Sequence, residues 1–168
     1  MSNELKWTRG LFGNEYTLIR NNKGIGGMKS GAFSFSARAE IDGRRYDFIH
    51  RGSFRRKTII YDRTADQPIG EIVFHPWLSR AFIRFSSGKM YKFRFTNLWE
   101  TEWAIQGGDG GMAIYSGNSR RGEIYEGNAD EASILAGLYI ANNFWEISMI
   151  VIIMALISSS IAVGIVFN

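Results

Sequence analysis

The stretch that decides the fold is NADEASILAGLYIANNFWEISMIVIIMALISSSIAVGIVFN, residues 128–168. It contains no Lys or Arg, and Glu146 is its only charged residue after Glu131. The chain before it alternates apolar and polar side chains and holds all 20 Lys and Arg residues. A segment as apolar as this is expected to be enclosed by protein, to cross a membrane, or to do both in succession.

The first part of this stretch, residues 128–143, is predicted to be a short buried helix that ends at Asn142-Asn143. It begins with acids and a cap at Asn128 or Asp130, and is then apolar on nearly every side, as expected of an enclosed helix. Roughly thirteen helical residues extend about 20 Å, which is too short for a bilayer. This length matches the height of a barrel whose strands of 7–8 residues tilt by about 40°.

The second part, residues 144–168, is predicted to be a separate apolar helix that anchors the chain in a membrane. Its uncharged run 147–167 would be roughly 31 Å long as a helix, close to the hydrocarbon thickness of a bilayer. An aromatic residue at the leading edge suits the membrane interface, so we expect an anchor delimited by Trp145, Ile147 and Phe167. The alternative is that this part, and not the first, is the buried core helix.

Residues 1–127 are predicted to form the body of the protein, a closed antiparallel β-barrel of about twelve strands. The 19 Gly, 2 Pro and 14% aromatic residues favour short strands joined by tight turns. Asp42-Gly43 is typical of a type I′ turn between two alternating runs, and residues 81–95 form a second hairpin. Closure into a barrel removes the exposed edges that so many strands would otherwise present. The fold class is therefore mainly β, with the barrel enclosing the first helix and followed by the second.

The charge of the chain is unevenly distributed. Three of the 16 acids (Asp130, Glu131 and Glu146) belong to the tail, so residues 1–128 carry 20 basic and 13 acidic side chains, a net charge of +7. A basic body on an apolar tail suits the anionic face of a membrane. The clearest basic cluster lies in two neighbouring strands and their connection, and its part from Arg51 to Lys57 is expected at one barrel rim. The residues expected to contact lipid headgroups or a protein partner are Arg44, Arg45, Arg51, Arg55, Arg56 and Lys57. The alternative is a set of solvated surface cations.

Sequence motifs for chemistry are few. The chain has no Cys, and His50 and His75 stand in no ligand-spaced cluster, so neither a metal site nor a cofactor is expected. No nucleophile elbow and no phosphate-binding loop occur, and no recognition helix points to nucleic acid. The sequence therefore favours a non-enzymatic protein.

Two segments resemble the tubby C-terminal-like fold, which tubby proteins, phospholipid scramblases and LURP-one-related proteins share. They are TIIYD (58–62) through PIGEI (68–72), and NADE (128–131) leading into ILAGLYI (134–140). The resemblance would cover residues 5–143 and implies a closed barrel around a hydrophobic helix. The family's functional residues do not carry over, because neither its basic headgroup site nor its acidic calcium-binding segment has a clear match here.

Three hypotheses for function follow. The first is a non-enzymatic barrel module tethered to a membrane, with the body on the cytoplasmic side because the cations all precede the anchor. The second is a soluble scaffold or carrier whose whole apolar tail is buried in protein. The third is a lipid-moving, scramblase-like protein.

Overall fold

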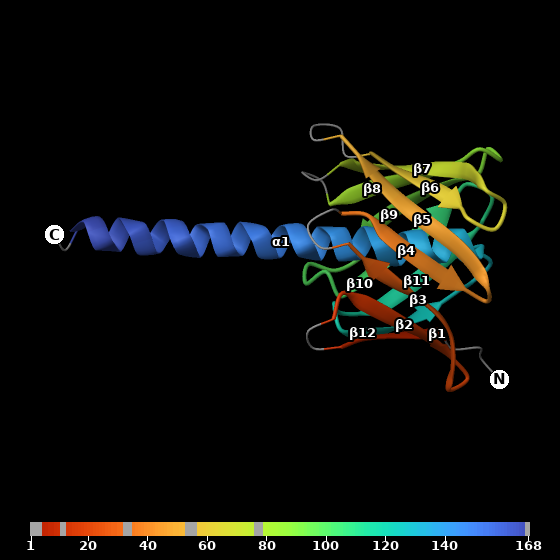
Figure 1. Cartoon of the computed structure of the whole chain (residues 1–168), viewed down its shortest axis with the longest axis horizontal. Coiled ribbons are helices and arrows are strands. Elements are labelled where there is room, and N and C mark those ends of the chain that lie inside the picture. The colour runs from red at the N-terminus through yellow and green to blue at the C-terminus, as the bar shows by residue number, and fades with distance from the viewer. Residues whose placement is uncertain (1–4, 11–12, 32–34, 53–56, 76–78, 167–168) are drawn as a thin grey trace.

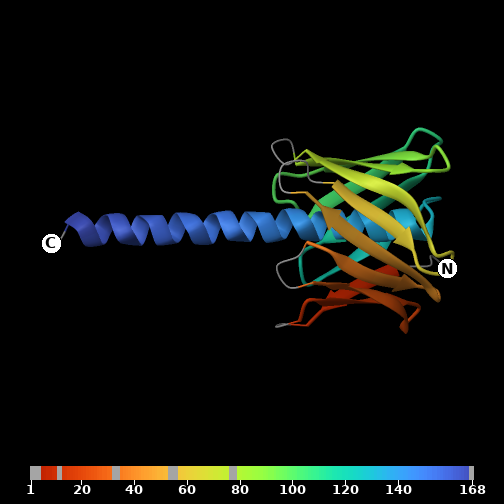
Figure 2. The ribbon, with the colours of Figure 1, turned by 45° about the horizontal axis from the view of Figure 1, so that its top comes forward.

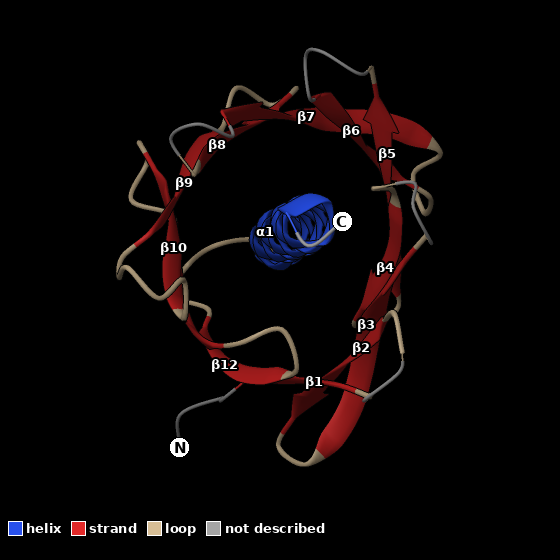
Figure 3. Ribbon diagram, turned by 90° about the vertical axis from the view of Figure 1, so that its left-hand side faces the viewer, coloured by secondary structure: helices blue, strands red, loops and turns tan. Residues whose placement is uncertain are grey.

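In a computed structural model, the chain forms a closed barrel threaded by one long helix (Figures 1 and 3). The structure describes residues 5–10, 13–31, 35–52, 57–75 and 79–166, with side chains in the helix up to Ser158. The twelve described strands are β1 (Leu5–Arg9), β2 (Glu15–Arg20), β3 (Lys23–Ser30), β4 (Ala37–Ile41), β5 (Arg44–Arg51), β6 (Lys57–Asp62), β7 (Gln67–His75), β8 (Arg80–Phe85), β9 (Met90–Phe95), β10 (Glu102–Gly107), β11 (Met112–Gly117) and β12 (Arg121–Tyr125). Each pairs antiparallel with the next, and β12 closes on β1, so the predicted fold class is confirmed.

The two predicted hairpins are confirmed, and local chemistry explains them. Asp42 and Gly43 adopt φ angles of 49° and 82°, the left-handed values that a type I′ turn requires at both central positions. In β9, Tyr91 and Phe93 are buried while Lys92 and Arg94 are exposed, as the period of two in a strand dictates. The barrel therefore has an apolar interior and a charged outer wall.

The interior is filled by α1 (Glu131–Val166), which runs along the barrel axis (Figure 2). Every residue from Ala132 to Phe144 is buried. The helix is tied to the wall by the Tyr115 hydroxyl, which donates to the Ile134 carbonyl at 2.8 Å. Gly137 faces the same phenol so closely that a Cβ atom there would overlap its oxygen. The approach of helix and wall therefore depends on this glycine.

The predicted division of the tail at Asn142-Asn143 differs from the structure, because α1 continues through both residues without a break. Their side chains support the helix instead of ending it. The Asn143 amide donates to the Tyr139 carbonyl at 2.9 Å, and the Asn142 amide donates to the Glu146 carboxylate at 2.8 Å. The two predicted helices are one helix with a buried half and an exposed half.

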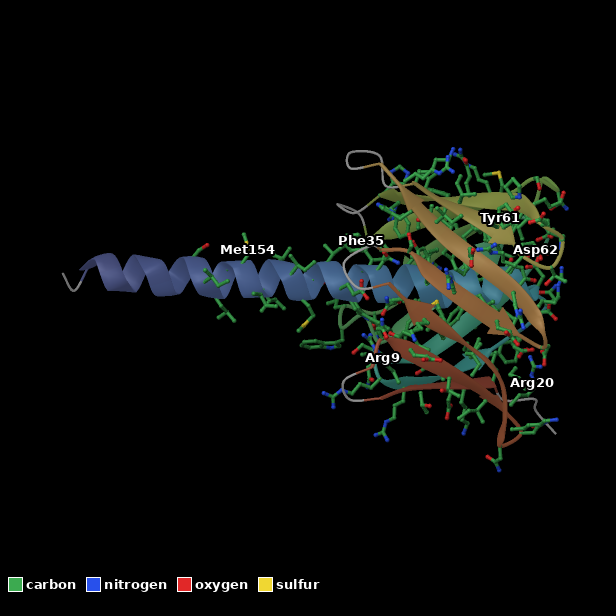
Figure 4. The ribbon with its side chains drawn as sticks, in the orientation of Figure 1. Arg9, Arg20, Phe35, Tyr61, Asp62 and Met154 are labelled. Atoms are coloured by element: carbon green, nitrogen blue, oxygen red, sulfur yellow. The ribbon has the colours of Figure 1, made fainter. Side chains whose placement is uncertain are left out.

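The two ends of the barrel are distinct, because α1 enters at one and leaves at the other (Figures 1 and 4). We call the loops where it begins the far rim: residues 21–22, 42–43, 63–66, 86–89, 108–111 and 126–130. We call the loops where it leaves the exit rim, and its described residues are 10, 13–14, 31, 35–36, 52, 79, 96–101 and 118–120.

Candidate functional site

The exit of α1 from the barrel is closed by aromatic side chains. Phe144 is 5% exposed and its ring lies 5.8–5.9 Å from those of Phe74, Phe93 and Phe95. One residue further, Trp145 packs edge-on against Trp103 at 5.2 Å, and its indole N–H donates to the Glu100 carbonyl at 3.2 Å. The barrel core thus ends at Trp145, which the sequence assigned to the membrane anchor.

A polar cluster lies on another side of the helix at the same level. The Asn142 side-chain oxygen accepts hydrogen bonds from the Tyr16 hydroxyl at 2.7 Å and from Arg9 at 3.2 Å, and its amide donates to the Ser30 hydroxyl at 3.2 Å. Burial raises the pKa of the Tyr16 phenol although Arg9 lies beside it. Because Asn142 and Ser30 are buried, these bonds satisfy polar groups that would otherwise be costly, and they fix the direction in which α1 leaves.

A groove of about 550 Å³ opens between the departing helix and the exit rim. Met149 and Ile150 form its helical wall, and Arg9 and Arg120 stand on the barrel side. Figure 4 shows Arg9 and Phe35 at this end of the barrel and Arg20, Tyr61 and Asp62 at the other. The groove therefore combines an apolar wall, the two cations and the carboxylate of Glu146, which also lines it.

Beyond the groove, α1 is an exposed apolar stem. Its large side chains from Met149 to Ile157 are between 49% and 64% exposed. By length and composition, the helix is long and apolar enough to cross a membrane, and 28% of the relevant window is buried in the barrel. This property was predicted from the sequence, although the anchoring residue Phe167 lies outside the described residues. Ile147, the predicted start of the anchor, is half-buried beside His50 and Phe74.

The structure divides the predicted basic cluster. Arg44 and Arg45 begin β5 next to the far rim, where Arg44 approaches Asp62 at 3.2 Å and Glu131 at 3.4 Å. Arg51 ends the same strand and pairs with Lys57 across β5 and β6 at the exit rim. The seven steps of β5 separate the two groups by about 23 Å. Arg55 and Arg56 lie outside the described residues. The described members of the cluster therefore do not form one patch, because a strand's two ends lie on opposite rims, while Arg51 and Lys57 lie together at one rim.

Other cations join Arg51 and Lys57 at the exit end of the barrel. Cross-strand partners of like charge occur there three times, each within two residues of a strand end: Lys29 with Arg38, Arg51 with Lys57, and Arg80 with Arg94. Like charges directly opposite one another destabilise a sheet. Lys29 approaches Glu15 and Lys57 approaches Glu71, but among the described residues no carboxylate forms an ion pair with Arg38, Arg51, Arg80, Arg94 or Arg120. The exit end thus presents uncompensated positive charge.

The far rim shows the opposite pattern. Its loops, all described, contain no large apolar residue and include Asp42, Asp66, Asp109, Glu126 and Asp130. Most cations there are paired, as Arg20 is with Asp42 at 2.6 Å and Glu126 at 2.5 Å. Among the described residues of this rim, Lys23, which lies opposite Arg20, is the exception. Burial would raise the pKa of the Asp62 carboxyl, but hydrogen bonds from the amides of Ala65 and Thr64 and from Arg44 lower it. In the exit-rim loops, the one described acid is Glu100, whose pKa is raised by burial.

Two other features bear on chemistry. A hollow of about 720 Å³ lies on the outer wall over β2–β5. Its charged residues other than Arg38 pair with one another, as in Arg45 with Glu40 and Arg63 with Asp47. Within the described ranges, no three His, Asp or Glu side chains gather in a group that could hold a metal ion. The exit rim with its groove is therefore the candidate site, and its geometry is that of a contact surface.

Sequence reasoning missed most of this site, including Arg9, Arg80, Arg94 and the loop 96–101. The order of the strands could have predicted which loops lie beside the departing helix, because alternate turns of an up-and-down barrel lie at the same end. A helix that follows the last strand enters at the end where that strand finishes, and it must leave beside the turns at the opposite end.

Comparison with known proteins identified no relative of this chain. No family model, curated protein or solved structure matches the chain.

Proposed function

We propose that the protein is a membrane-tethered β-barrel module, without enzymatic activity, in which α1 is both the core of the barrel and its anchor. The observation that carries this proposal is the division of one continuous helix. Its residues up to Phe144 are enclosed by twelve strands, whereas its described side chains from Ser148 to Ser158 are exposed and mostly apolar.

The length of the exposed half supports a bilayer as its environment. Residues 147–166 extend about 30 Å as a helix, which equals the hydrocarbon thickness of a typical bilayer. The Ser158 hydroxyl donates to the Met154 carbonyl at 2.9 Å, so its polar group is satisfied within the helix. No unpaired charge would enter the hydrocarbon, because the last charged residue, Glu146, precedes this segment.

The placement of charge supports an orientation. All 20 Lys and Arg residues precede the anchor, so the positive-inside rule places the barrel on the cytoplasmic side. The cations of the exit rim would then face the anionic lipids of that leaflet. Membrane lipids are therefore the partners that we propose.

The alternative is a soluble scaffold whose apolar tail is buried in protein. The barrel itself takes in the helix only as far as Phe144, so burial of the stem would require another chain. The relation to tubby-like domains, and a lipid-moving activity with it, remain predictions from the resemblance alone.

Alkaline carbonate extraction of membranes from cells that express the full chain tests the proposal. We expect the full chain to remain in the membrane pellet until detergent is added. The matched control is a chain truncated after Ser148, which keeps Phe144 and Trp145 in the barrel and should appear in the soluble fraction. Release of the full chain by carbonate as a discrete oligomer would refute the anchor and favour the scaffold.

A further inference from the structure

The exit rim carries an exposed apolar pair that the barrel fold does not need. Leu98 and Trp99, in the loop between β9 and β10, are 97% and 86% exposed. They are the two most exposed large apolar side chains among the described residues. Trp is enriched at membrane interfaces because its ring is apolar while its N–H can meet water or headgroups.

The loop holds this pair in a fixed position. The Asn97 side-chain oxygen accepts hydrogen bonds from the amides of Thr101 at 3.0 Å and Glu102 at 3.2 Å, and its amide donates to the Thr101 hydroxyl at 2.7 Å. The Thr96 amide donates to the Glu102 carbonyl at 2.8 Å. The exposure of Leu98 and Trp99 is therefore built into an ordered turn.

The loop is also fastened to α1 at the point where the helix leaves the barrel. The Glu100 carbonyl accepts the Trp145 indole hydrogen, so the apolar pair and the start of the stem form one connected unit. Because α1 leaves along the barrel axis (Figure 1), a bilayer around the stem would meet the exit rim and not the far rim.

The positive charges next to this loop favour an anionic surface as its partner. Arg94 lies two residues before Thr96 and faces Arg80 across β8 and β9. Neither forms an ion pair with a described carboxylate, so the positive charges of Arg80 and Arg94 repel each other at this edge of the barrel. Anionic headgroups would relieve this repulsion. The polar, acidic far rim offers no comparable surface.

We propose that the exit rim docks on an anionic phospholipid surface, with Leu98 and Trp99 inserted at the boundary between headgroups and acyl chains. This inference rests on the proposed function, since α1 brings the rim to the bilayer. The docked loop is a second attachment that stops the barrel from pivoting about a single helix.

Site-specific labelling of the full chain in vesicles tests the inference. The chain has no Cys, so Leu98→Cys can carry a single environment-sensitive fluorophore, and Ala65→Cys on the far rim is the matched control. Both positions are exposed, so neither label disturbs the core. In vesicles of phosphatidylcholine and phosphatidylserine, we expect the label at 98 to be quenched by nitroxide lipids and shielded from aqueous iodide. The label at 65 should show the reverse.

Quenching by iodide that is equal at the two positions, in a protein that resists carbonate, would overturn the docking while leaving the helical anchor in place. If the label at 98 were shielded from iodide only when a soluble protein is added, and were not quenched by nitroxide lipids, the docking would also be overturned, in favour of a protein partner. Loss of the protein to the carbonate supernatant would instead refute the proposed function.

The role of charge has its own measurement. Arg80→Gln with Arg94→Gln should lower the ratio of shielded to accessible label at 98 by about 30-fold, since each cation near an anionic surface contributes about 1 kcal/mol. The control pair Arg63→Gln with Lys89→Gln removes two far-rim cations and should leave the ratio unchanged. Equal ratios in both variants would overturn the preference for anionic lipid.

Discussion

The position of Phe144 predicts where the chain can be cut without losing the barrel. A chain ending after Ser148 keeps the ring of Phe144 among Phe74, Phe93 and Phe95, and it keeps the Trp145 contacts with Trp103 and Glu100. A chain ending after Asn143, at the boundary that the sequence predicts, removes both aromatic residues. Only the longer chain should fold stably.

The expected difference follows from the contacts that the shorter chain loses. Emptying the site of a buried Phe costs about 3–5 kcal/mol. The edge-to-face pair of Trp145 with Trp103 adds about 0.5–1.5 kcal/mol, and its hydrogen bond adds about 1 kcal/mol. The sum, about 4.5–7.5 kcal/mol, is a large fraction of the whole stability of an ordinary domain, which is about 5–15 kcal/mol.

Urea unfolding followed by tryptophan fluorescence provides the assay, because Trp7 and Trp103 are fully buried with ring centroids 5.4 Å apart. Within the chain of residues 1–148, Phe144→Ala should lower the free energy of unfolding by about 3–5 kcal/mol. Leu98→Ala, at a side chain that is 97% exposed, should change it very little. The reasoning fails if the two truncated chains unfold at the same urea concentration, since the core would then end before Phe144.

Two further predictions concern the helix and the far rim. Gly137→Ala should destabilise the protein by about 1–3 kcal/mol, because the added methyl group overlaps the Tyr115 phenol, which is held by Trp103 and the Ile134 carbonyl. The gain in helix propensity offsets part of this, and Gly24→Ala, whose Cβ would meet open space, is the control for thermal unfolding. Asp62→Asn should lower stability at neutral pH by about 1–2 kcal/mol, since the carboxylate accepts two backbone hydrogen bonds. The folded-state pKa of Asp62 lies below its ordinary value, so its contribution is complete above about pH 4 and is lost as the pH falls through the folded pKa. Denaturation curves of the two proteins should therefore converge in acid, and a constant difference down to pH 2 would contradict this role.

Much of the fold was predictable because each strand's signal is local. Alternation in residues such as Tyr91 to Arg94 and the Asp42-Gly43 turn depend on near neighbours in the chain. The site was less predictable because it joins residues from opposite parts of the chain. Arg9, Ser30 and Asn142 form one cluster, yet nothing local to any of them indicates the other two.

By itself, the sequence determined that this protein has a β-rich, basic body and an apolar tail long enough for both a barrel and a bilayer, because composition, alternation and length are properties of short segments. Only the tertiary structure decided that the tail is one helix, that its enclosed half ends at Phe144 and Trp145, and that the basic cluster separates onto two rims. The physical reason is closure. When twelve strands close around a helix, strand direction assigns every turn to one rim or the other, and the available contacts determine how much of the helix the barrel can bury.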